Sequence, residues 1–270
     1  ENTVDGKFFV TARGWEDLSE ILKSYEELQV EIGEELIGEF LQKEEIARDF
    51  AGYYRLYEKY KSDYQIQEIL DGNVTTGQLK TCCDMGKKAS FEERFTVTEM
   101  LLEAVTERIS VFQKIDEKTE KLYENLKLLK IFLQEKNSVE AMEQFVASRR
   151  KALDAKICSE LLTAEEAARE EEQIRILEEY FFQLKELHIS DVAEGIEQIG
   201  ERFGNVCRLR NEKLEETKKM LEQAFSFLEE CFGEGQELLL FETGLTGDDR
   251  CSIFISQYGC PSYFKHCELL

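Results

Sequence analysis

Proline is almost absent from this sequence, which has one such residue among 270. Proline removes a backbone donor and clashes with the preceding helical turn, so its scarcity permits long, uninterrupted helices. The 34% of charged residues fits the solvated outer faces of such helices, and the 42% of hydrophobic residues is enough for packed cores. These features exclude a disordered acidic tail and predict an all-α protein.

Positive charge is also scarce, since 34 Lys and Arg residues face 57 Asp and Glu residues and the formal net charge is −23. Such a chain repels nucleic acid or an anionic membrane surface unless its basic residues are gathered into a patch. The most basic stretches, 149–151 and 208–210, are each followed by acids within a few residues and are typical of solvated helix faces. We therefore expect neither nucleic acid nor a membrane among the partners.

Long apolar runs and leader sequences are missing as well. The chain has no stretch of about 18 or more apolar residues, and no positively charged segment followed by the apolar core of a signal peptide. This excludes a typical transmembrane helix, and we expect a cytoplasmic location by default.

The residues of common catalytic motifs are few. The chain contains two histidines, and neither stands with a Ser or Cys nucleophile in the pattern of a hydrolase triad. A Gly-x-x-x-x-Gly-Lys-Ser/Thr loop is absent, because residues 86–88 lack the first glycine and the hydroxyl that would reach magnesium. We predict no catalytic residues and no ATP hydrolysis by this chain alone.

The eight cysteines are scattered along the chain rather than closely spaced as in small secreted domains, so we expect reduced thiols. The neighbouring Cys82 and Cys83 are expected to be buried or idle. One group has metal-ligand chemistry: Cys251, Cys260, His266 and Cys267. Because this group lacks the paired Cys-x-x-Cys knuckles of zinc sites, its members are weak candidates and we expect no metal. A metal-dependent thiol protein is the weakest functional alternative.

Apolar residues recur at three- and four-residue steps early in the chain, which predicts helices within 15–28, 32–41 and 46–64. The third of these carries an aromatic stripe that we expect to pack in a core: Phe50, Tyr53, Tyr54, Tyr57, Tyr60 and Tyr64. The following stretch, 73–90, is poorer in apolar residues and is interpreted as a linker.

The longest predicted helix begins after Ser90, which forms a capping-box pattern with Glu93, and continues without Gly or Pro to about Lys136. Its apolar residues fall on two heptad positions, which indicates a coiled-coil seam. Further helices are expected at about 138–161, 163–188 and 191–232. The last of these matches the first in length, so the two are the predicted antiparallel partners.

The predicted division of the chain therefore has four parts: a compact helical domain at 1–72, a linker at 73–90, a long-helix coiled-coil arm at 91–233 and a small packed C-terminal cap at 234–270. Within the cap, residues 253–255 have the composition of a short strand. Because no second clear strand accompanies them, we expect helical turns there.

Residues 8–19 read FFVTARGWEDLS and place Arg13 beside a glycine at the start of a predicted helix. This segment resembles the sensor-2 stretch of MoxR-type AAA+ ATPases. Segment 46–54, IARDFAGYY, and segment 254–265, FISQYGCPSYFK, are similar to parts of the same proteins. The resemblance implies that residues 1–72 are the lid of such an ATPase. Arg13 is then the candidate nucleotide-sensing residue, which reaches the γ-phosphate of bound ATP.

The resemblance also implies that the chain is the non-catalytic C-terminal part of a larger ATPase, and Glu1 in place of an initiator Met fits this expectation. The expected partners are the ATPase core of the same polypeptide, which would bind ATP and magnesium, and an unidentified client or accessory protein. The lid would sense nucleotide and the arm would transmit this state in a chaperone-like assembly reaction. This chain itself is expected to carry no cofactor.

The residues alone leave a second interpretation open. Arg13 is then a surface arginine paired with Glu16 or Asp17, and the chain is a free-standing helical coiled-coil scaffold or protein-interaction module without nucleotide.

Overall fold

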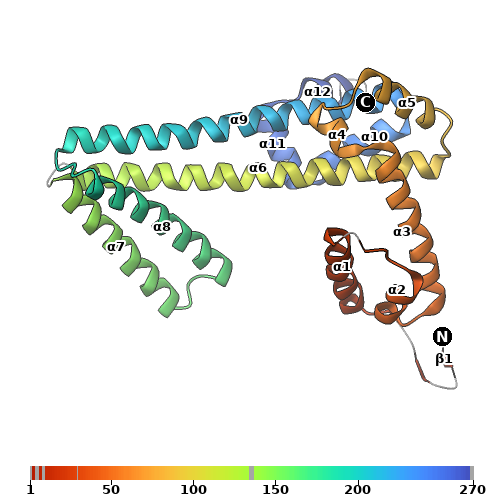
Figure 1. Cartoon of the computed structure of the whole chain (residues 1–270), viewed down its shortest axis with the longest axis horizontal. Helices are drawn as coiled ribbons and strands as arrows, with labels where there is room; N and C mark the ends of the chain where they lie inside the picture. The colour runs from red at the N-terminus through yellow and green to blue at the C-terminus, as the bar shows by residue number, and fades with distance from the viewer. Residues whose placement is uncertain (1, 4–5, 8–9, 29, 134–136, 268–270) are drawn as a thin grey trace. The chain divides into compact units, whose positions relative to one another are not determined.

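The structure of the chain, a computed structural model, describes residues 2–3, 6–7, 10–28, 30–133 and 137–267. These residues are helical almost throughout (Figure 1). A short antiparallel ribbon near the start pairs β1 (Asn2–Thr3) with β2 (Gly6–Lys7). The predicted all-α class is therefore confirmed.

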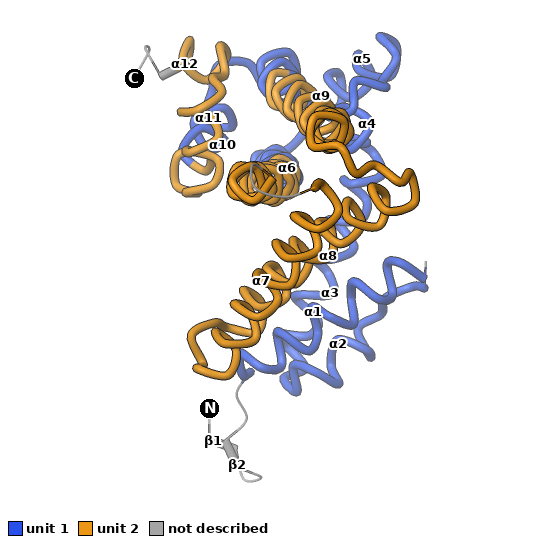
Figure 2. Tube along the Cα trace, turned by 90° about the vertical axis from the view of Figure 1, so that its left-hand side faces the viewer, with its two compact units in different colours: residues 1–104, 223–243 blue, residues 105–222, 244–270 orange. Residues whose placement is uncertain are grey.

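The chain forms two compact units, each discontinuous in sequence (Figure 2). Unit 1 comprises residues 1–104 and 223–243, and unit 2 comprises residues 105–222 and 244–270. Three helices run through a unit boundary: α6 (Phe91–Leu133), α9 (Val192–Phe232) and α10 (Gln236–Gly247). The other helices of unit 1 are α1 (Ala12–Glu27), α2 (Glu34–Leu41), α3 (Glu44–Tyr64), α4 (Ile66–Asp71) and α5 (Thr76–Gly86). The other helices of unit 2 are α7 (Ser138–Cys158), α8 (Ala164–Glu186), α11 (Asp249–Tyr258) and α12 (Pro261–Cys267).

In unit 1, the helices α1, α2 and α3 bury a small core of their own, formed by Leu18, Ile37, Leu41, Ala47 and Ala51. The three helices predicted from the apolar spacing are present. The aromatic stripe of α3 is only partly core, because Tyr64 is fully buried while Tyr53 is 49% exposed. Tyr64 Oη donates a hydrogen bond of 2.8 Å to Glu93 Oε1 at the start of α6. Burial raises the pKa of the Tyr64 phenol, and this hydrogen bond raises it further.

Residues 73–90, expected to be a linker, contain the helix α5, which starts with a capping box formed by Thr75 and Gln78. Both cysteines of α5 are buried: Cys82 is a free thiol, and Cys83 forms a disulfide with Cys231 of α9. The expectation of reduced thiols throughout is therefore wrong for this pair. The physical reason is that α5 packs on the end of α9 within unit 1, so that a Cβ at Gly86 would lie 2.7 Å from the Phe232 ring. That contact joins segments far apart in the sequence and leaves little trace in local periodicity.

In unit 2, the helices α6 and α9 run antiparallel. Asp116 of α6 pairs with Arg210 of α9, and further along α6 the Tyr123 ring stacks at 5.9 Å on Phe203, which lies earlier in α9. The hairpin of α7 and α8 shares one buried cluster with both long helices, which includes Leu122, Phe145, Leu177 and Ile199. Residues 134–136, the predicted end of the first long helix, lie outside the described residues. At the C-terminus, residues 253–255 lie within α11, so the expectation of helix there is confirmed.

Candidate functional site

Arg13 lies in the first turn of α1, directly after Ala12, where the helix begins. Thr11 is the N-cap, and its Oγ1 accepts a hydrogen bond of 3.0 Å from the Gly14 amide. The predicted helix entrance at this glycine is present. Phe8 and Phe9, the first residues of the resembling segment, lie outside the described residues.

The turn that carries Arg13 is held in place by the two helices that follow. A Cβ at Gly14 would lie 2.8 Å from the Phe40 carbonyl oxygen, so glycine permits a close approach of α1 to the backbone of α2. Trp15 packs edge-on against Phe50 of α3, with ring centroids 5.1 Å apart. The backbone of the Arg13 turn is therefore well supported, although its side chain is not.

The Arg13 side chain itself is 88% exposed, and its Nε lies 3.8 Å from Asp17 Oδ2. An exposed ion pair at this distance contributes little to stability and is readily exchanged for another anion. The pairing with Asp17 is one of the two, with Glu16 or with Asp17, that the residues alone suggested. It leaves the guanidinium accessible to a group outside this chain.

The C-terminal cysteines have separate surroundings. Cys251 is fully buried, and its thiol lies 3.6 Å from Thr106 Oγ1. Cys260 is also buried, with its Sγ 3.2 Å from Glu222 Oε1. Burial raises the pKa of Cys251 to about 11 and that of Cys260 to about 12, and the Glu222 carboxylate adds to the second shift. Both thiols are therefore protonated and weakly reactive at neutral pH.

The remaining members of the weak metal-ligand group are His266, which is 3% exposed, and Cys267, whose side chain lies outside the description. Across the residues that the structure describes, no three His, Cys, Asp or Glu side chains come together in a way that suits a metal ion. The four candidates of the sequence are thus not brought into a metal-binding cluster within the described part.

A charged network that the sequence did not predict joins α6, α9 and α11 in unit 2. Arg210 Nη2 lies 2.6 Å from Asp116 Oδ1, and Tyr258 Oη donates a hydrogen bond of 2.7 Å to Asp116 Oδ2. The guanidinium also stacks over the rings of Phe112 and Tyr258, at 5.3 Å from each centroid. Because every charge and hydroxyl has a partner, this arrangement fits a structural role.

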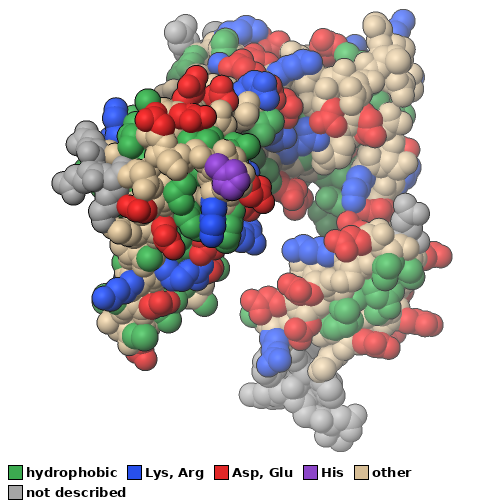
Figure 3. All heavy atoms as spheres, turned by 60° about the vertical axis from the view of Figure 1, so that its left-hand side comes forward, with side chains coloured by type: hydrophobic (Ala, Val, Ile, Leu, Met, Phe, Trp, Pro, Cys, Tyr) green, Lys and Arg blue, Asp and Glu red, His purple; other side chains and the backbone are tan. Residues whose placement is uncertain are grey.

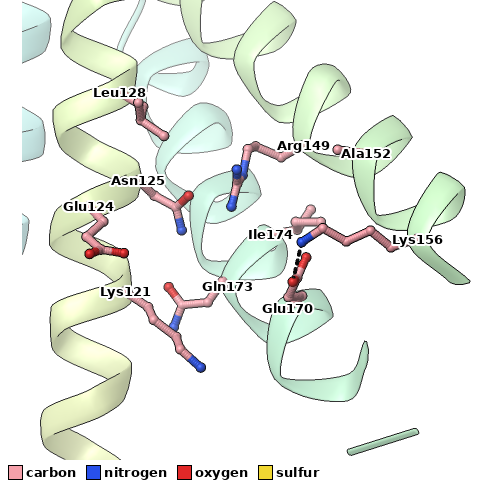
Figure 4. A pocket seen from close by; sticks show the side chains of 10 residues that line it. All are labelled: Lys121, Glu124, Asn125, Leu128, Arg149, Ala152, Lys156, Glu170, Gln173 and Ile174. Atoms are coloured by element: carbon pink, nitrogen blue, oxygen red, sulfur yellow. Dashed lines mark hydrogen bonds and ion pairs between the residues drawn. The ribbon is translucent and has the colours of Figure 1, made fainter. Parts of the chain in front are cut away.

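A second polar feature of unit 2 is a cavity of about 310 Å³ between α6, α7 and α8 (Figure 4). Two buried amide side chains line it, Asn125 of α6 and Gln173 of α8, which are 4% and 6% exposed. One sequence signal was available for Asn125, since it lies three residues after Leu122 and four before Leu129, on the buried face of its helix. Gln173 follows three glutamates and looks like ordinary helix surface in the sequence.

The surface has no large basic area on the face drawn in Figure 3, where Lys and Arg side chains lie interspersed with Asp and Glu. Within the described ranges, none of the longer helices has the continuous hydropathy that a bilayer-spanning segment requires.

Comparison with protein-family models, with curated proteins and with solved structures finds no match to this chain.

Proposed function

We propose that this chain is the non-catalytic C-terminal part of a MoxR-like AAA+ ATPase. The helices α1, α2 and α3 act as a lid that senses nucleotide through Arg13. The long helices α6 and α9 act as an arm that couples the state of the lid to a client or accessory protein. The observation that carries this proposal is the position of Arg13 on a well-supported helix turn, with a side chain that is 88% exposed.

Arginine suits the sensing role because it stays charged and its planar fork binds two phosphate oxygens at once. A γ-phosphate offers far more negative charge than the single carboxylate of Asp17 at 3.8 Å, so the guanidinium would transfer to it when ATP is bound. Loss of the γ-phosphate would release the guanidinium again. Since α1 shares its core with α2 and α3, the change would be transmitted to the three helices together.

The first test is the gene sequence upstream of Glu1. The proposal requires a Gly-x-x-x-x-Gly-Lys-Ser/Thr loop in the preceding region. An initiator Met directly before Glu1 would contradict it.

The second test uses the full-length protein with Arg13→Ala. We expect ATP hydrolysis to fall by about tenfold or more, and Arg13→Lys to restore only part of it, because an ammonium lacks the fork. Lys23→Ala is the matched control, since Lys23 is an exposed cation on the same helix, and it should leave the rate unchanged. Equal rates of ATP hydrolysis for the Arg13→Ala and parent proteins would show that Arg13 has no part in the reaction.

One observation favours the alternative, a helical protein-interaction module without nucleotide. Unit 1 has an open apolar groove between the start of α6 and α10, where Phe91 is 53% and Leu239 is 45% exposed. Exposed apolar residues that cluster in a groove are typical of helix-binding surfaces. In this alternative, substitution of Arg13 has no effect on partner binding, whereas Leu239→Ser weakens it.

A further inference from the structure

The cavity between α6, α7 and α8 contains an acceptor atom without a partner. Gln173 Nε2 donates a hydrogen bond of 3.2 Å to the Lys118 carbonyl, which fixes the orientation of the amide. The other amide atom, Gln173 Oε1, is fully buried and has no hydrogen-bond partner. Buried polar atoms are nearly always hydrogen-bonded, so an orphaned acceptor calls for a donor that the described chain does not supply. Figure 4 shows the Asn125 and Gln173 side chains extending toward each other's helix, into this space.

The cations around the cavity are the second observation. Lys156 of α7 is used internally, because its Nζ lies 2.6 Å from Glu170 Oε1. Arg149, about two turns earlier on the same helix, makes no ion pair with a described residue, whereas the adjacent Arg150 pairs with both Glu171 and Glu178. Lys121 of α6 likewise makes no ion pair within the described ranges.

Neither Arg149 nor Lys121 makes an ion pair within the described residues, so both can bind an anionic group of a ligand. In Figure 4 the Arg149 guanidinium is directed from α7 toward the space between α6 and α8. Arg149 and Lys121 therefore form a part of the cavity lining that can bind an anionic group. The cavity also offers acceptors, namely the Glu124 carboxylate and the Gln173 carbonyl oxygen.

We propose that this cavity is a binding site for a small zwitterion of the α-amino-acid class. The ligand carboxylate binds Arg149 and Lys121, and its ammonium group donates to Gln173 Oε1 and Glu124. The uncharged part of the ligand lies against Leu128 and Ile174, the apolar part of the lining. The volume of about 310 Å³ is at the lower end of the range for small-molecule sites, roughly 300 to 1,000 Å³, and suits a ligand of this size.

Other ligand classes fit the lining less well. A metal ion would be repelled by Arg149 and Lys121. A simple anion without a proton, such as sulfate, would satisfy the cations but leave Gln173 Oε1 without a donor. A nucleoside triphosphate carries more negative charge than the two available cations can balance, with Glu124 and Glu170 close by.

The experiment is a titration of the 270-residue chain with each proteinogenic amino acid at up to millimolar concentration, followed by calorimetry and by the thermal unfolding midpoint. Sulfate is the comparison probe, because it is an anion without a hydrogen-bond donor. We expect saturable one-to-one binding of at least one amino acid, with a rise in the midpoint, and no displacement of that amino acid by sulfate. If no amino acid binds, or if sulfate binds equally well, the proposal is wrong.

Two substitutions locate the site. Arg149→Gln and Gln173→Leu should each raise the Kd by about tenfold or more. The first removes the cation that binds the ligand carboxylate, and the second removes the acceptor that binds its ammonium group. Lys151→Gln, which changes an exposed cation on the same helix, should leave the Kd unchanged. Gln173→Leu removes the unpartnered carbonyl together with the hydrogen bond to the Lys118 carbonyl, so the unfolding midpoint of each variant is also measured without ligand, and Kd values are compared only where both proteins are folded. An unchanged Kd in either Arg149→Gln or Gln173→Leu would overturn the assignment.

The site lies wholly in unit 2 and does not involve Arg13. Amino-acid binding and nucleotide sensing can therefore fail independently in these experiments.

Discussion

Cys83 of α5 and Cys231 of α9 form a disulfide across 148 positions of sequence, and both residues are buried in unit 1. The bond closes a long loop, which restricts the unfolded chain far more than the folded one. We predict that Cys83→Ala combined with Cys231→Ala lowers the free energy of unfolding by about 2 to 5 kcal/mol. Urea titration under oxidising conditions measures this loss.

The control for this disulfide is reduction. Adding a reductant should destabilise the parent chain by a similar amount and leave the double variant unaffected. Cys158→Ala, which changes an exposed free cysteine, should change nothing. If peptide mapping of the oxidised chain found Cys83 and Cys231 as free thiols, the pairing would be refuted.

The Asp116 and Arg210 pair should be one of the stronger polar contacts of unit 2, because Arg210 is only 19% exposed in its side chain and Tyr258 completes the network. Arg210→Ala leaves the Asp116 carboxylate without its cation, and we expect a loss of roughly 1 to 3 kcal/mol, after allowance for partial exposure. Arg208→Ala removes a cation of the same helix that is 67% exposed and 3.9 Å from Glu212, so it should cost less than about 0.5 kcal/mol. Equal losses for the two variants in denaturant unfolding would show that the network adds no stability.

Gly14 and Gly52 should respond in opposite directions to the same substitution. Gly14→Ala places a Cβ 2.8 Å from the Phe40 carbonyl oxygen, and we expect about 1 to 3 kcal/mol of destabilisation. Gly52→Ala, within α3, meets nothing within 4 Å and should stabilise by about 0.5 to 1 kcal/mol, since alanine restricts the unfolded chain and favours helix. Thermal unfolding of both variants measures the difference, and a stabilised Gly14→Ala variant would contradict the close packing of α1 on α2.

Cys260 should make stability decrease at alkaline pH. Burial, assisted by Glu222, raises its pKa from 9.0 to about 12 in the folded chain. Above pH 9.0 the unfolded chain loses this proton and the folded chain keeps it, so the free energy of unfolding falls as the pH rises toward 12. The loss approaches about 1.4 kcal/mol per pH unit for one such group.

The measurement is the free energy of unfolding of Cys260→Ala and the parent chain between neutral and alkaline pH. The parent should decline more steeply than Cys260→Ala between pH 9.0 and about 12, whereas Cys158→Ala should follow the parent. Tyrosines such as the half-buried Tyr57, whose pKa is raised to about 12 chiefly by desolvation, contribute equally to all three proteins and cancel in the comparison. Parallel pH profiles for Cys260→Ala and the parent would show that the Cys260 thiol is not protected.

The helices themselves were largely predictable from the sequence. The N-cap side chains of Thr163 and Asn137 mark the starts of α8 and α7, where the sequence placed them. Helical hydrogen bonds join residues four apart, so the information that creates them is local and can be read from spacing. The helix α5 was not predicted, because the information that places it is not local. Its few apolar residues give little local signal, and its burial depends on Cys231 and Phe232 of α9.

The two candidate sites differ in the same respect: the Arg13 site is marked by a contiguous sequence segment, and the cavity of unit 2 by contacts between helices that are distant in sequence. Arg13 was proposed from the sequence because it lies in a contiguous segment that resembles a known motif, whereas Gln173 and Arg149 line one cavity only because α8 folds back on α7 and both pack on α6. Nothing local distinguishes Gln173 from the exposed polar residues around it. Only the tertiary structure shows that its Oε1 atom is buried without a hydrogen-bond partner.

The sequence by itself determined that these 270 residues are helical, acidic and contain no Gly-x-x-x-x-Gly-Lys-Ser/Thr loop, because composition, periodicity and contiguous motifs act over a few residues. Only the tertiary structure decided that residues 223–243 belong with 1–104, and that residues 244–270 belong with 105–222. Which distant segments meet depends on the burial of side chains from both at once. The free energy gained by this burial depends on both segments of a pair, so it cannot be read from the sequence of either segment alone.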